Sequence, residues 1–167
     1  LIRRNLPELI HGISRIDAID DVAITTNGVL FSSLAARLKE AGLNRVNLSI
    51  DTLQKDRYHY ITRGGDVAVV IKALETALAE GLEPVKVNTV LIKGFNDDEI
   101  LDFCRLAYNL PVHIRFIEFM PVGEIKYWNS DRIVANSDVL DQIVKHFDLK
   151  PGRVSRGNGP AKYFTME

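Results

Sequence analysis

Cysteine is nearly absent from this chain, which has a single one, Cys104, among its 167 residues. One thiol excludes an internal disulfide and cannot by itself hold a metal cluster. Its neighbours Phe103 and Leu106 are apolar, so we expect a buried thiol on a helix. The four histidines show no spacing typical of metal ligands. We therefore expect no metal site built from residues of this chain alone.

Excess charge of one sign and long apolar runs are missing too. The 21 Lys and Arg against 22 Asp and Glu leave a net charge of -1, so no overall field attracts nucleic acid or an anionic membrane. The sequence has neither a run of about 18 apolar residues nor the apolar core of a signal peptide at its start. We expect one globular, cytoplasmic unit with no nucleic-acid or membrane partner, in which any anion site is local.

Predicted strands and helices alternate regularly along the chain. Strands are expected at 22–26, 46–51, 85–92 and 113–120. Helices are expected to begin near Asn5, Ser32 or Ser33, Asp66, Asn96 and Ser137, with Asn5, Asp66 and Ser137 as capping residues. Gly42 and Gly81 are expected to end two of these helices and Pro151-Gly152 the last, and 121–135 is expected to be a loop. Such alternation predicts a parallel sheet with right-handed crossovers, either open or curled into a barrel.

Polar residues recur at alternate positions of these strands. In 46–51 every second residue is polar, and in 85–90 Lys86 and Asn88 share one side. Parallel strands covered by helices on both faces are nearly continuously apolar, and a full eight-stranded barrel fills its interior with branched apolar side chains. The pattern predicts an incomplete or wider barrel with a polar, ligand-holding interior.

Two cations are predicted to share that interior. Lys86 and Arg115 lie on strands that should be neighbours, and their repulsion would be relieved by a bound anion such as a phosphate. Alternatively, Asp51 or Glu118 neutralises them as a buried ion pair. The residues alone leave both readings open.

Eight segments together resemble one known family, the molybdenum cofactor biosynthesis protein A family of GTP 3',8-cyclases, within the radical S-adenosylmethionine superfamily. The segments are Leu1–Asn5, Ile24–Gly28, Ala41–Leu43, Val46–Asp51, Val85–Val90, Gly94–Asp97, Arg115–Gly123 and Gly159–Ala161. The resemblance implies an α/β fold, a partial TIM-like barrel derived from the incomplete (β/α)6 radical SAM barrel, with about four βα units present. Residues 1–120 would form this barrel, and 121–167 would begin a C-terminal extension with a loop, a helix and a truncated strand.

The resemblance also implies a lyase reaction in molybdenum cofactor biosynthesis. A 4Fe-4S cluster cleaves S-adenosylmethionine reductively, and the resulting 5'-deoxyadenosyl radical takes a hydrogen from the ribose C3' of GTP. Attack on guanine C8 then gives (8S)-3',8-cyclo-7,8-dihydroguanosine 5'-triphosphate, while a second 4Fe-4S cluster holds the purine. The implied partners are GTP, S-adenosylmethionine, an electron donor and a downstream cyclic pyranopterin monophosphate synthase; a homodimer is left open.

Six positions match contact residues of that family. Ser49, Met120 (through its backbone) and Asn27 match S-adenosylmethionine contacts, and Thr25, Lys86 and Arg115 match GTP contacts. No residue matches a catalytic or metal-ligating one. The cysteines that hold the clusters would lie before Leu1 and beyond Glu167, so we expect this chain alone to be inactive.

Two other functions fit the same pattern. In the first, Lys86 is the Schiff-base nucleophile of an aldolase-like barrel, its pKa lowered by burial and by Arg115. In the second, the chain is a non-catalytic nucleotide-binding module that keeps the phosphate contacts without radical chemistry.

Overall fold

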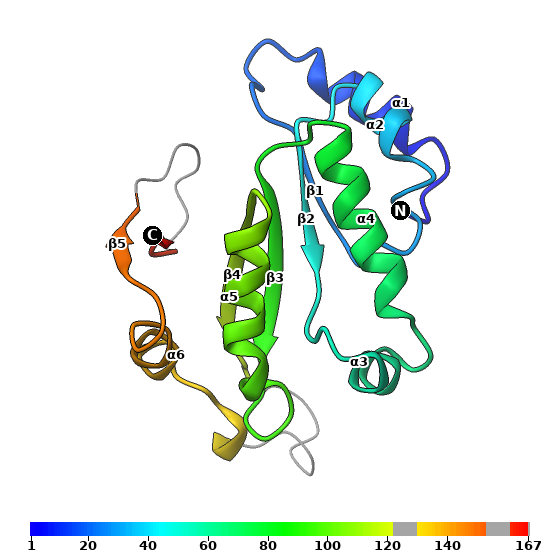
Figure 1. The fold of residues 1–167 in the computed structure, drawn as a ribbon. Coiled ribbons are helices and arrows are strands. Elements are labelled where there is room, and N and C mark those ends of the chain that lie inside the picture. Colours follow the sequence, from blue (N-terminus) through cyan, green and yellow to red (C-terminus); the bar gives the residue numbers. More distant parts are fainter. Residues whose placement is uncertain (122–129, 153–160, 167) are drawn as a thin grey trace.

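The computed structural model describes residues 1–121, 130–152 and 161–166. Its main sheet is parallel and contains β1 (Ala23–Thr26), β2 (Arg45–Ser49), β3 (Val85–Leu91) and β4 (Val112–Glu118), neighbours in that order. A second sheet pairs β5 (Leu149–Pro151) with β6 (Phe164–Met166) in the antiparallel sense. The expected α/β architecture with parallel strands in chain order is confirmed (Figure 1).

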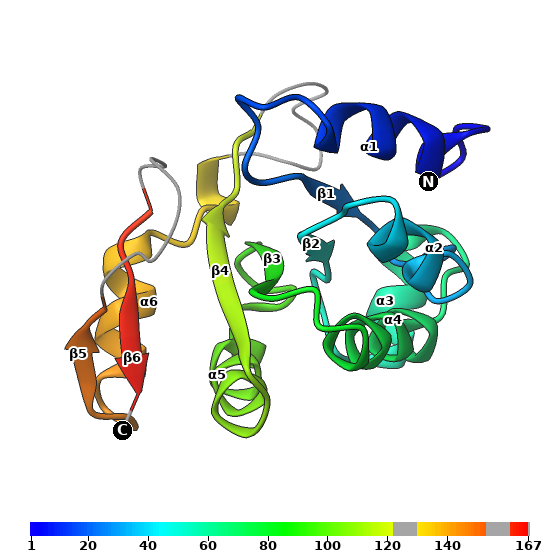
Figure 2. The ribbon, with the colours of Figure 1, turned by 90° about the horizontal axis from the view of Figure 1, so that it is seen from above.

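Helices cover one side of the main sheet. The α-helices are α1 (Leu6–Ser14), α2 (Ala35–Glu40), α3 (Lys55–Thr62), α4 (Val67–Ala79), α5 (Ile100–Asn109) and α6 (Asn136–Ile143), and 3-10 turns lie at Asp97–Glu99 and Ser130–Arg132. Figure 2 shows β1 to β4 along an arc with α2, α4 and α5 outside it. We call the side of the sheet opposite these helices the concave face. This arrangement is a partial TIM-like barrel, as expected.

The core lies between the sheet and its helices. Val46, Leu48 and Ile50 are completely buried, and so are Val70 and Leu74 of α4. Their spacing explains both elements, because alternate residues of a strand share one face and residues three or four apart share one side of a helix. Burial of each such side chain contributes about 1.5–3 kcal/mol, so this layer holds the strands in place beneath the concave face.

A smaller core joins the C-terminal elements to α5. Leu91, Ile100 and Cys104 pack there with Val139 and Ile143 of α6. The expectation of a buried helical thiol is confirmed, since Cys104 is 4% exposed. Burial raises the pKa of this thiol to about 11, so it stays protonated and unreactive near neutral pH.

Several predicted helix ends differ from the structure. Asp66 caps α4 by accepting a hydrogen bond from the Ala68 N–H at 3.0 Å, as expected, and Gly42 and Gly81 have positive φ beyond their helices. The side-chain caps expected of Asn5 and Ser137 are wrong. Asn5 instead has a left-handed backbone, and Ser137 lies inside α6, whose N-cap is Ala135.

The start of α2 lies beyond the predicted Ser32 or Ser33, whereas the helix expected near Asn96 does begin there, as the 3-10 turn Asp97–Glu99 that leads into α5. Helix α2 begins at Ala35 after Leu34, whereas the Ser33 hydroxyl donates to the Leu30 carbonyl in the preceding turn. Asn96 does not cap a helix with its side chain. Its Oδ1 accepts from the Ile92 N–H at 2.7 Å, and its amide donates to the Asp51 and Val90 carbonyls. It therefore joins the ends of β2 and β3.

The last third of the chain differs from expectation in its boundaries. Helix α6 ends at Ile143, well before Phe147, and Pro151 lies in β5 rather than at a helix end. The strand expected at the chain end does form, and β5 is its partner. Of the loop expected at 121–135, residues 122–129 lie outside the described residues, and Ser130–Arg132 form a 3-10 turn. The domain boundary at residue 120 remains a prediction.

Gly28, two residues after the end of β1, has no room for a side chain. Its φ is +80°, and a Cβ there would lie 3.0 Å from Val70 Cγ1 and 3.2 Å from Ala73 Cβ. We expect Gly28→Ala to lower the free energy of unfolding by about 2–3 kcal/mol, from backbone strain and overpacking together. Gly81→Ala is the matched control, because Gly81 has φ +63° with nothing within 4 Å. Equal losses for both variants in urea unfolding would contradict a contribution from the contact with α4.

No described helix combines the length and the apolar character needed to cross a bilayer.

Candidate functional site

Polar side chains form two rows across the concave face. Strand pairing sets Thr25 opposite Asn47, Asn47 opposite Lys86, and Lys86 opposite His113. The second row, two residues further along each strand, consists of Ser49, Asn88 and Arg115. The predicted alternation is confirmed, since Val85 and Val87, on either side of Lys86 along β3, are completely buried in the core on the helix side. Four strands thus bring distant polar residues together.

Lys86 and Arg115 lie on neighbouring strands, and the described residues offer neither of them a carboxylate partner. Lys86 is only 3% exposed. The expected alternative of a buried ion pair is wrong, because neither cation forms a salt bridge with a described carboxylate. Asp51 Oδ1 accepts from the Val90 N–H at 3.0 Å, and Glu118 Oε1 accepts from the Asn136 N–H at 2.7 Å. The two carboxylates are bound to backbone instead.

The electrostatics of this face favour a bound anion. Burial, and then the charge of Arg115, lower the pKa of Lys86. Burial, followed by Lys86 and Arg115, also lowers the pKa of His113. Burial raises the pKa of Asp51, although the Val90 hydrogen bond opposes this. Each of the three shifts disfavours the charged form of its group. A bound anion would stabilise the positive charges of Lys86 and Arg115.

Among the described residues, three buried atoms on this face have no hydrogen-bond partner: Asn47 Oδ1, Asn88 Oδ1 and Arg115 Nε. Buried polar groups are nearly always paired, so orphaned ones point to a missing ligand. Two acceptors and one donor require a molecule that carries both donors and acceptors. A nucleotide, with hydroxyl or amine donors and phosphate acceptors, fits this set.

The structure brings together four of the six predicted contact residues. Thr25, Ser49, Lys86 and Arg115 all lie on the concave face, and Asn47 donates to Thr25 Oγ1 at 3.2 Å. Asn27 lies just past β1, where its Oδ1 accepts from the Val29 N–H at 3.3 Å. Met120 lies two residues beyond β4 and is 73% exposed. Their roles as contacts remain predictions.

Three residues of this face were not predicted. His113 and Arg45 lie two positions before Arg115 and Asn47, so strand alternation alone could have indicated them. Arg45 forms a salt bridge with Asp21 at the start of β2. Tyr163 comes from the segment before β6, and its hydroxyl accepts from Arg115 Nη2 at 3.5 Å. No local pattern in the sequence places it there.

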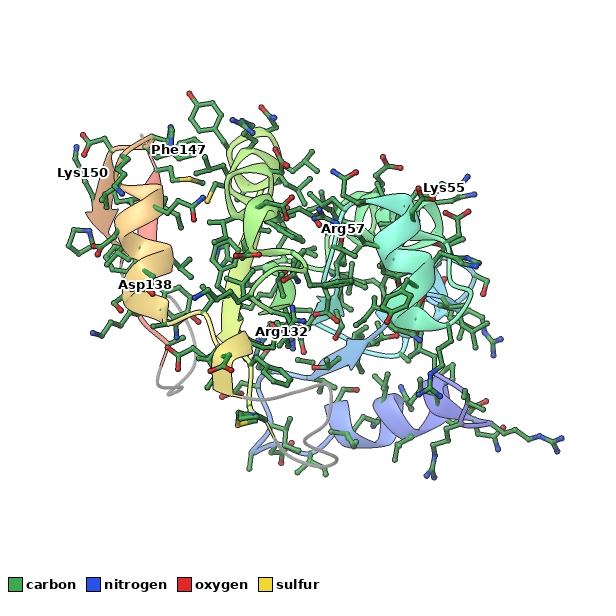
Figure 3. All side chains as sticks on the ribbon, turned by 90° about the horizontal axis from the view of Figure 1, so that it is seen from below. Lys55, Arg57, Arg132, Asp138, Phe147 and Lys150 are labelled. Atoms are coloured by element: carbon green, nitrogen blue, oxygen red, sulfur yellow. The ribbon has the colours of Figure 1, made fainter. Side chains whose placement is uncertain are left out.

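A buried carboxylate ties together the loops at the carboxyl end of the sheet. Glu99, 1% exposed, accepts from Thr52 Oγ1 at 2.6 Å, from the Leu53 N–H at 2.7 Å and from Arg57 Nη1 at 2.9 Å. We call these residues, with Asp98, the Glu99 network. Arg57 extends from α3 toward the turn before α5 (Figure 3) and also binds the exposed Asp98. The network fixes the segment that follows Ser49.

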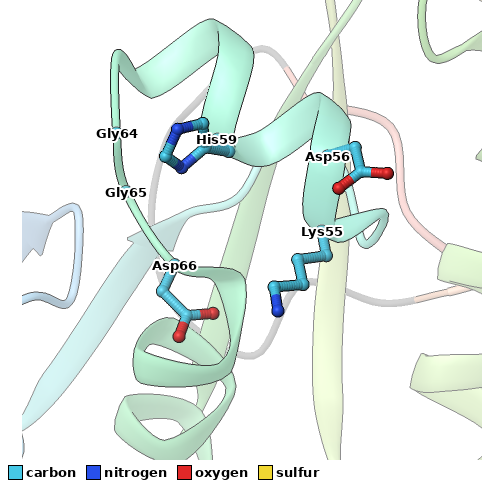
Figure 4. Close-up of a pocket in the computed structure, with 6 residues that line it drawn as sticks. All are labelled: Lys55, Asp56, His59, Gly64, Gly65 and Asp66. Atoms are coloured by element: carbon cyan, nitrogen blue, oxygen red, sulfur yellow. The ribbon is translucent and has the colours of Figure 1, made fainter.

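Helix α3, which no pattern in the sequence predicted, lines a surface pocket away from the two rows. Its lining consists of Lys55, Asp56 and His59 of α3 together with Gly64, Gly65 and Asp66, which precede α4 (Figure 4). None of the six predicted contact residues is among them. Asp66 is engaged as the α4 cap. This pocket is therefore separate from the candidate site.

Within the described residues, no group of three or more His, Cys, Asp or Glu side chains could hold a metal ion. Cys104 lies in the core between α5 and α6, on the helix side of the sheet. The described residues therefore do not fit an iron–sulfur cluster as ligands. Their polar rows fit organic molecules that offer phosphates and hydroxyls.

Comparisons with known proteins agree with this geometry. The sequence profile of the radical SAM superfamily matches residues 1–107. A GTP 3',8-cyclase from Syntrophomonas wolfei subsp. wolfei is 50% identical over 167 residues, which is 100% of this chain and 51% of that protein. One from Pelotomaculum thermopropionicum is 49% identical over 100% of this chain and 52% of its own length. The chain thus spans about half the length of the curated relatives it matches.

A solved structure, described as TYW1 with a lysine-pyruvate adduct bound, shares the fold. It aligns with a TM-score of 0.56 and 20% sequence identity, over 81% of this chain and 44% of that one. The profile match covers more than half of the chain and includes β1, β2 and β3, three of the four strands that carry the two polar rows. The chain belongs to the radical SAM superfamily.

Proposed function

We propose that this chain is the central part of a GTP 3',8-cyclase, a lyase of molybdenum cofactor biosynthesis that uses S-adenosylmethionine and 4Fe-4S clusters. The observation that carries the proposal is a pair of cations, Lys86 and Arg115, that have no carboxylate partner among the described residues and lie beside the unpaired amide oxygens of Asn47 and Asn88. High identity to curated cyclases along the whole chain supports it. Those relatives do not favour the aldolase-like alternative or the non-catalytic nucleotide-binding module.

In this proposal the cations bind the triphosphate of GTP. Arg115 offers Nε, which has no protein partner, and a planar guanidinium suits phosphate oxygens. Lys86 adds a compact second charge from the neighbouring strand. Thr25 would contact GTP at the edge of the first row. Because the strands are fixed by the helix-side core, these groups are held in place before the ligand arrives.

Ser49, Asn27 and the backbone of Met120 would hold S-adenosylmethionine. All three lie at or just beyond the carboxyl ends of parallel strands, where ligands bind in such folds. When bound, S-adenosylmethionine and a reduced cluster would supply the radical chemistry. The residues of this chain orient the two ligands toward each other and cover their polar groups.

The remaining partners follow from this function. We propose an electron donor that reduces the cluster and a cyclic pyranopterin monophosphate synthase that consumes the product. We also propose a cytoplasmic location, because the ligands are soluble metabolites. Homodimer formation stays a prediction.

The experiment that tests the function uses the full-length protein, reconstituted anaerobically with iron and sulfide. GTP deuterated at C3' is supplied with S-adenosylmethionine and dithionite, and the products are analysed by mass spectrometry. The expected result is the cyclised nucleotide together with 5'-deoxyadenosine that carries deuterium. Cleavage of S-adenosylmethionine without deuterium transfer would refute GTP as the substrate. Borohydride trapping of a carbonyl compound on Lys86 would favour the aldolase-like alternative.

A further inference from the structure

Tyr163 reaches the concave face from a distant part of the chain. It precedes β6 and lies 48 residues after Arg115, yet its hydroxyl accepts a hydrogen bond from Arg115 Nη2 at 3.5 Å. Lys86 Nζ lies 5.9 Å from the centre of its ring. The ring of His113 meets it edge-on, with centroids 6.3 Å apart and an interplanar angle of 73°. One side chain thus contacts three residues of the two rows.

The contacts of Tyr163 with Lys86 and Arg115 are electrostatically favourable. The face of an aromatic ring is electron-rich and attracts an ammonium group, whereas a phenol oxygen accepts from a guanidinium. Tyr163 therefore contacts Arg115 through its hydroxyl, and Lys86 through its ring and its hydroxyl together. Since Lys86 and Arg115 have no carboxylate partner among the described residues, repulsion would otherwise drive the two cations apart.

The hydrogen bond also fixes which edge of Arg115 remains available. Tyr163 takes Nη2, at one corner of the guanidinium, while Nε stays buried without a partner. A guanidinium held at one corner cannot rotate freely, so the direction of the Nε–H bond is set. The free donor is then ready for an anionic oxygen.

We propose that Tyr163 is a positioning residue of an anion site, which holds Lys86 by its ring and Arg115 by its hydroxyl so that both bind one polyphosphate. The identification of that polyphosphate as part of GTP rests on the proposed function. The anion site itself does not. The site recognises linked phosphates through two fixed cations and requires no base or ribose contact.

The test measures calorimetric binding of inorganic tripolyphosphate, GTP and guanosine to the full-length protein. Tyr163→Phe keeps the ring and removes the hydroxyl, so we expect tripolyphosphate to bind about fivefold more weakly. Tyr163→Leu removes both contacts, with an expected loss of about 30-fold. Guanosine should bind all forms equally. Tyr108→Phe is the matched control, because Tyr108 on α5 is 63% exposed and far from the two rows in the fold.

A coupling measurement separates positioning from general stability. If Tyr163 acts through Arg115, then Tyr163→Phe should cause almost no further loss of tripolyphosphate binding in an Arg115→Met background. Independent, additive losses would overturn the inference. So would unchanged tripolyphosphate binding in both Tyr163 variants, an equal loss for guanosine, or no binding of tripolyphosphate to the unmodified protein.

Failure of the proposed function gives a different result. Tripolyphosphate binding that depends on Tyr163, in a protein that does not cyclise GTP, would support the anion site and refute the cyclase. Cyclase activity that is unchanged in Tyr163→Leu, together with unchanged tripolyphosphate binding, would support the cyclase and refute the role of Tyr163 in the anion site.

Discussion

Replacement of Lys86 by methionine is expected to weaken GTP binding by about 30- to 300-fold while it stabilises the unliganded fold. A charged hydrogen bond to a phosphate, lost from a buried site, corresponds to about 2–3.5 kcal/mol of binding free energy. Without ligand the same charge is unfavourable, because Lys86 is 3% exposed and lies beside Arg115. Methionine fills a similar volume without charge, so we expect a gain of about 1 kcal/mol in the free energy of unfolding.

The gain in stability should depend on pH. Burial and Arg115 place the pKa of Lys86 in the folded protein below its value in the unfolded chain. The unfolded chain therefore binds the proton more tightly, and the penalty is fully present at pH values below the folded pKa. It is relieved as the pH rises through that pKa toward the ordinary value for lysine. The advantage of Lys86→Met should accordingly be largest near neutral pH and shrink in alkaline solution.

Calorimetric titration with GTP and urea unfolding at several pH values measure both effects. Lys72→Met is the matched control, since Lys72 is exposed on the outer side of α4. The control should leave GTP binding unchanged and show no stabilisation that depends on pH. Wild-type GTP affinity in Lys86→Met would contradict the assignment of Lys86 to the anion site.

Glu99→Ala is expected to lower the free energy of unfolding by about 3–5 kcal/mol, a large part of the stability of a typical domain. Its carboxylate satisfies three donors, including the Leu53 N–H and the Arg57 guanidinium. The substitution leaves the Leu53 N–H without its acceptor and Arg57 with only its contact to Asp98. Loss of a buried charge from a closed network is costly because the partner groups remain desolvated.

Chemical unfolding and amide hydrogen exchange test this prediction together. The Leu53 N–H should exchange much faster in Glu99→Ala than in the wild type. The matched control is Asp98→Asn, because Asp98 also binds Arg57 but its own side chain is 62% exposed. This substitution should lower the free energy of unfolding by at most about 1 kcal/mol. The network would not depend on Glu99 if the two substitutions proved equally destabilising.

Strand alternation allowed much of the concave face to be predicted from sequence. The two-residue period in 46–51 and 85–90 is a local property, and each strand keeps it in the structure. Lys86 and Arg115 become neighbours because consecutive strands of a βαβ unit pair in chain order, as they do here. The same argument would have included His113, which shares the face of Arg115.

The features that were missed depend on tertiary contacts. Helix α3 has few apolar residues, with only Tyr58 buried, so its sequence lacks the helical period. Asn5 and Ser137 have the chemistry of helix caps, yet the backbone around them takes other conformations. Tyr163 meets Lys86 only after the chain has passed through α6 and β5. No periodic pattern extends over such a separation.

The position of Arg115 opposite Asn88 also constrains how the sheet can form. A shift of β4 by one residue would turn the Arg115 guanidinium toward α5, where Phe103 and Phe116 now meet edge to face with centroids 6.2 Å apart. An unpaired charge in that apolar layer would cost several kcal/mol, and Phe116 would lie among the polar rows. The charges that prepare the site for an anion therefore also make a misaligned sheet unfavourable, so that only the correctly paired strands yield a stable protein.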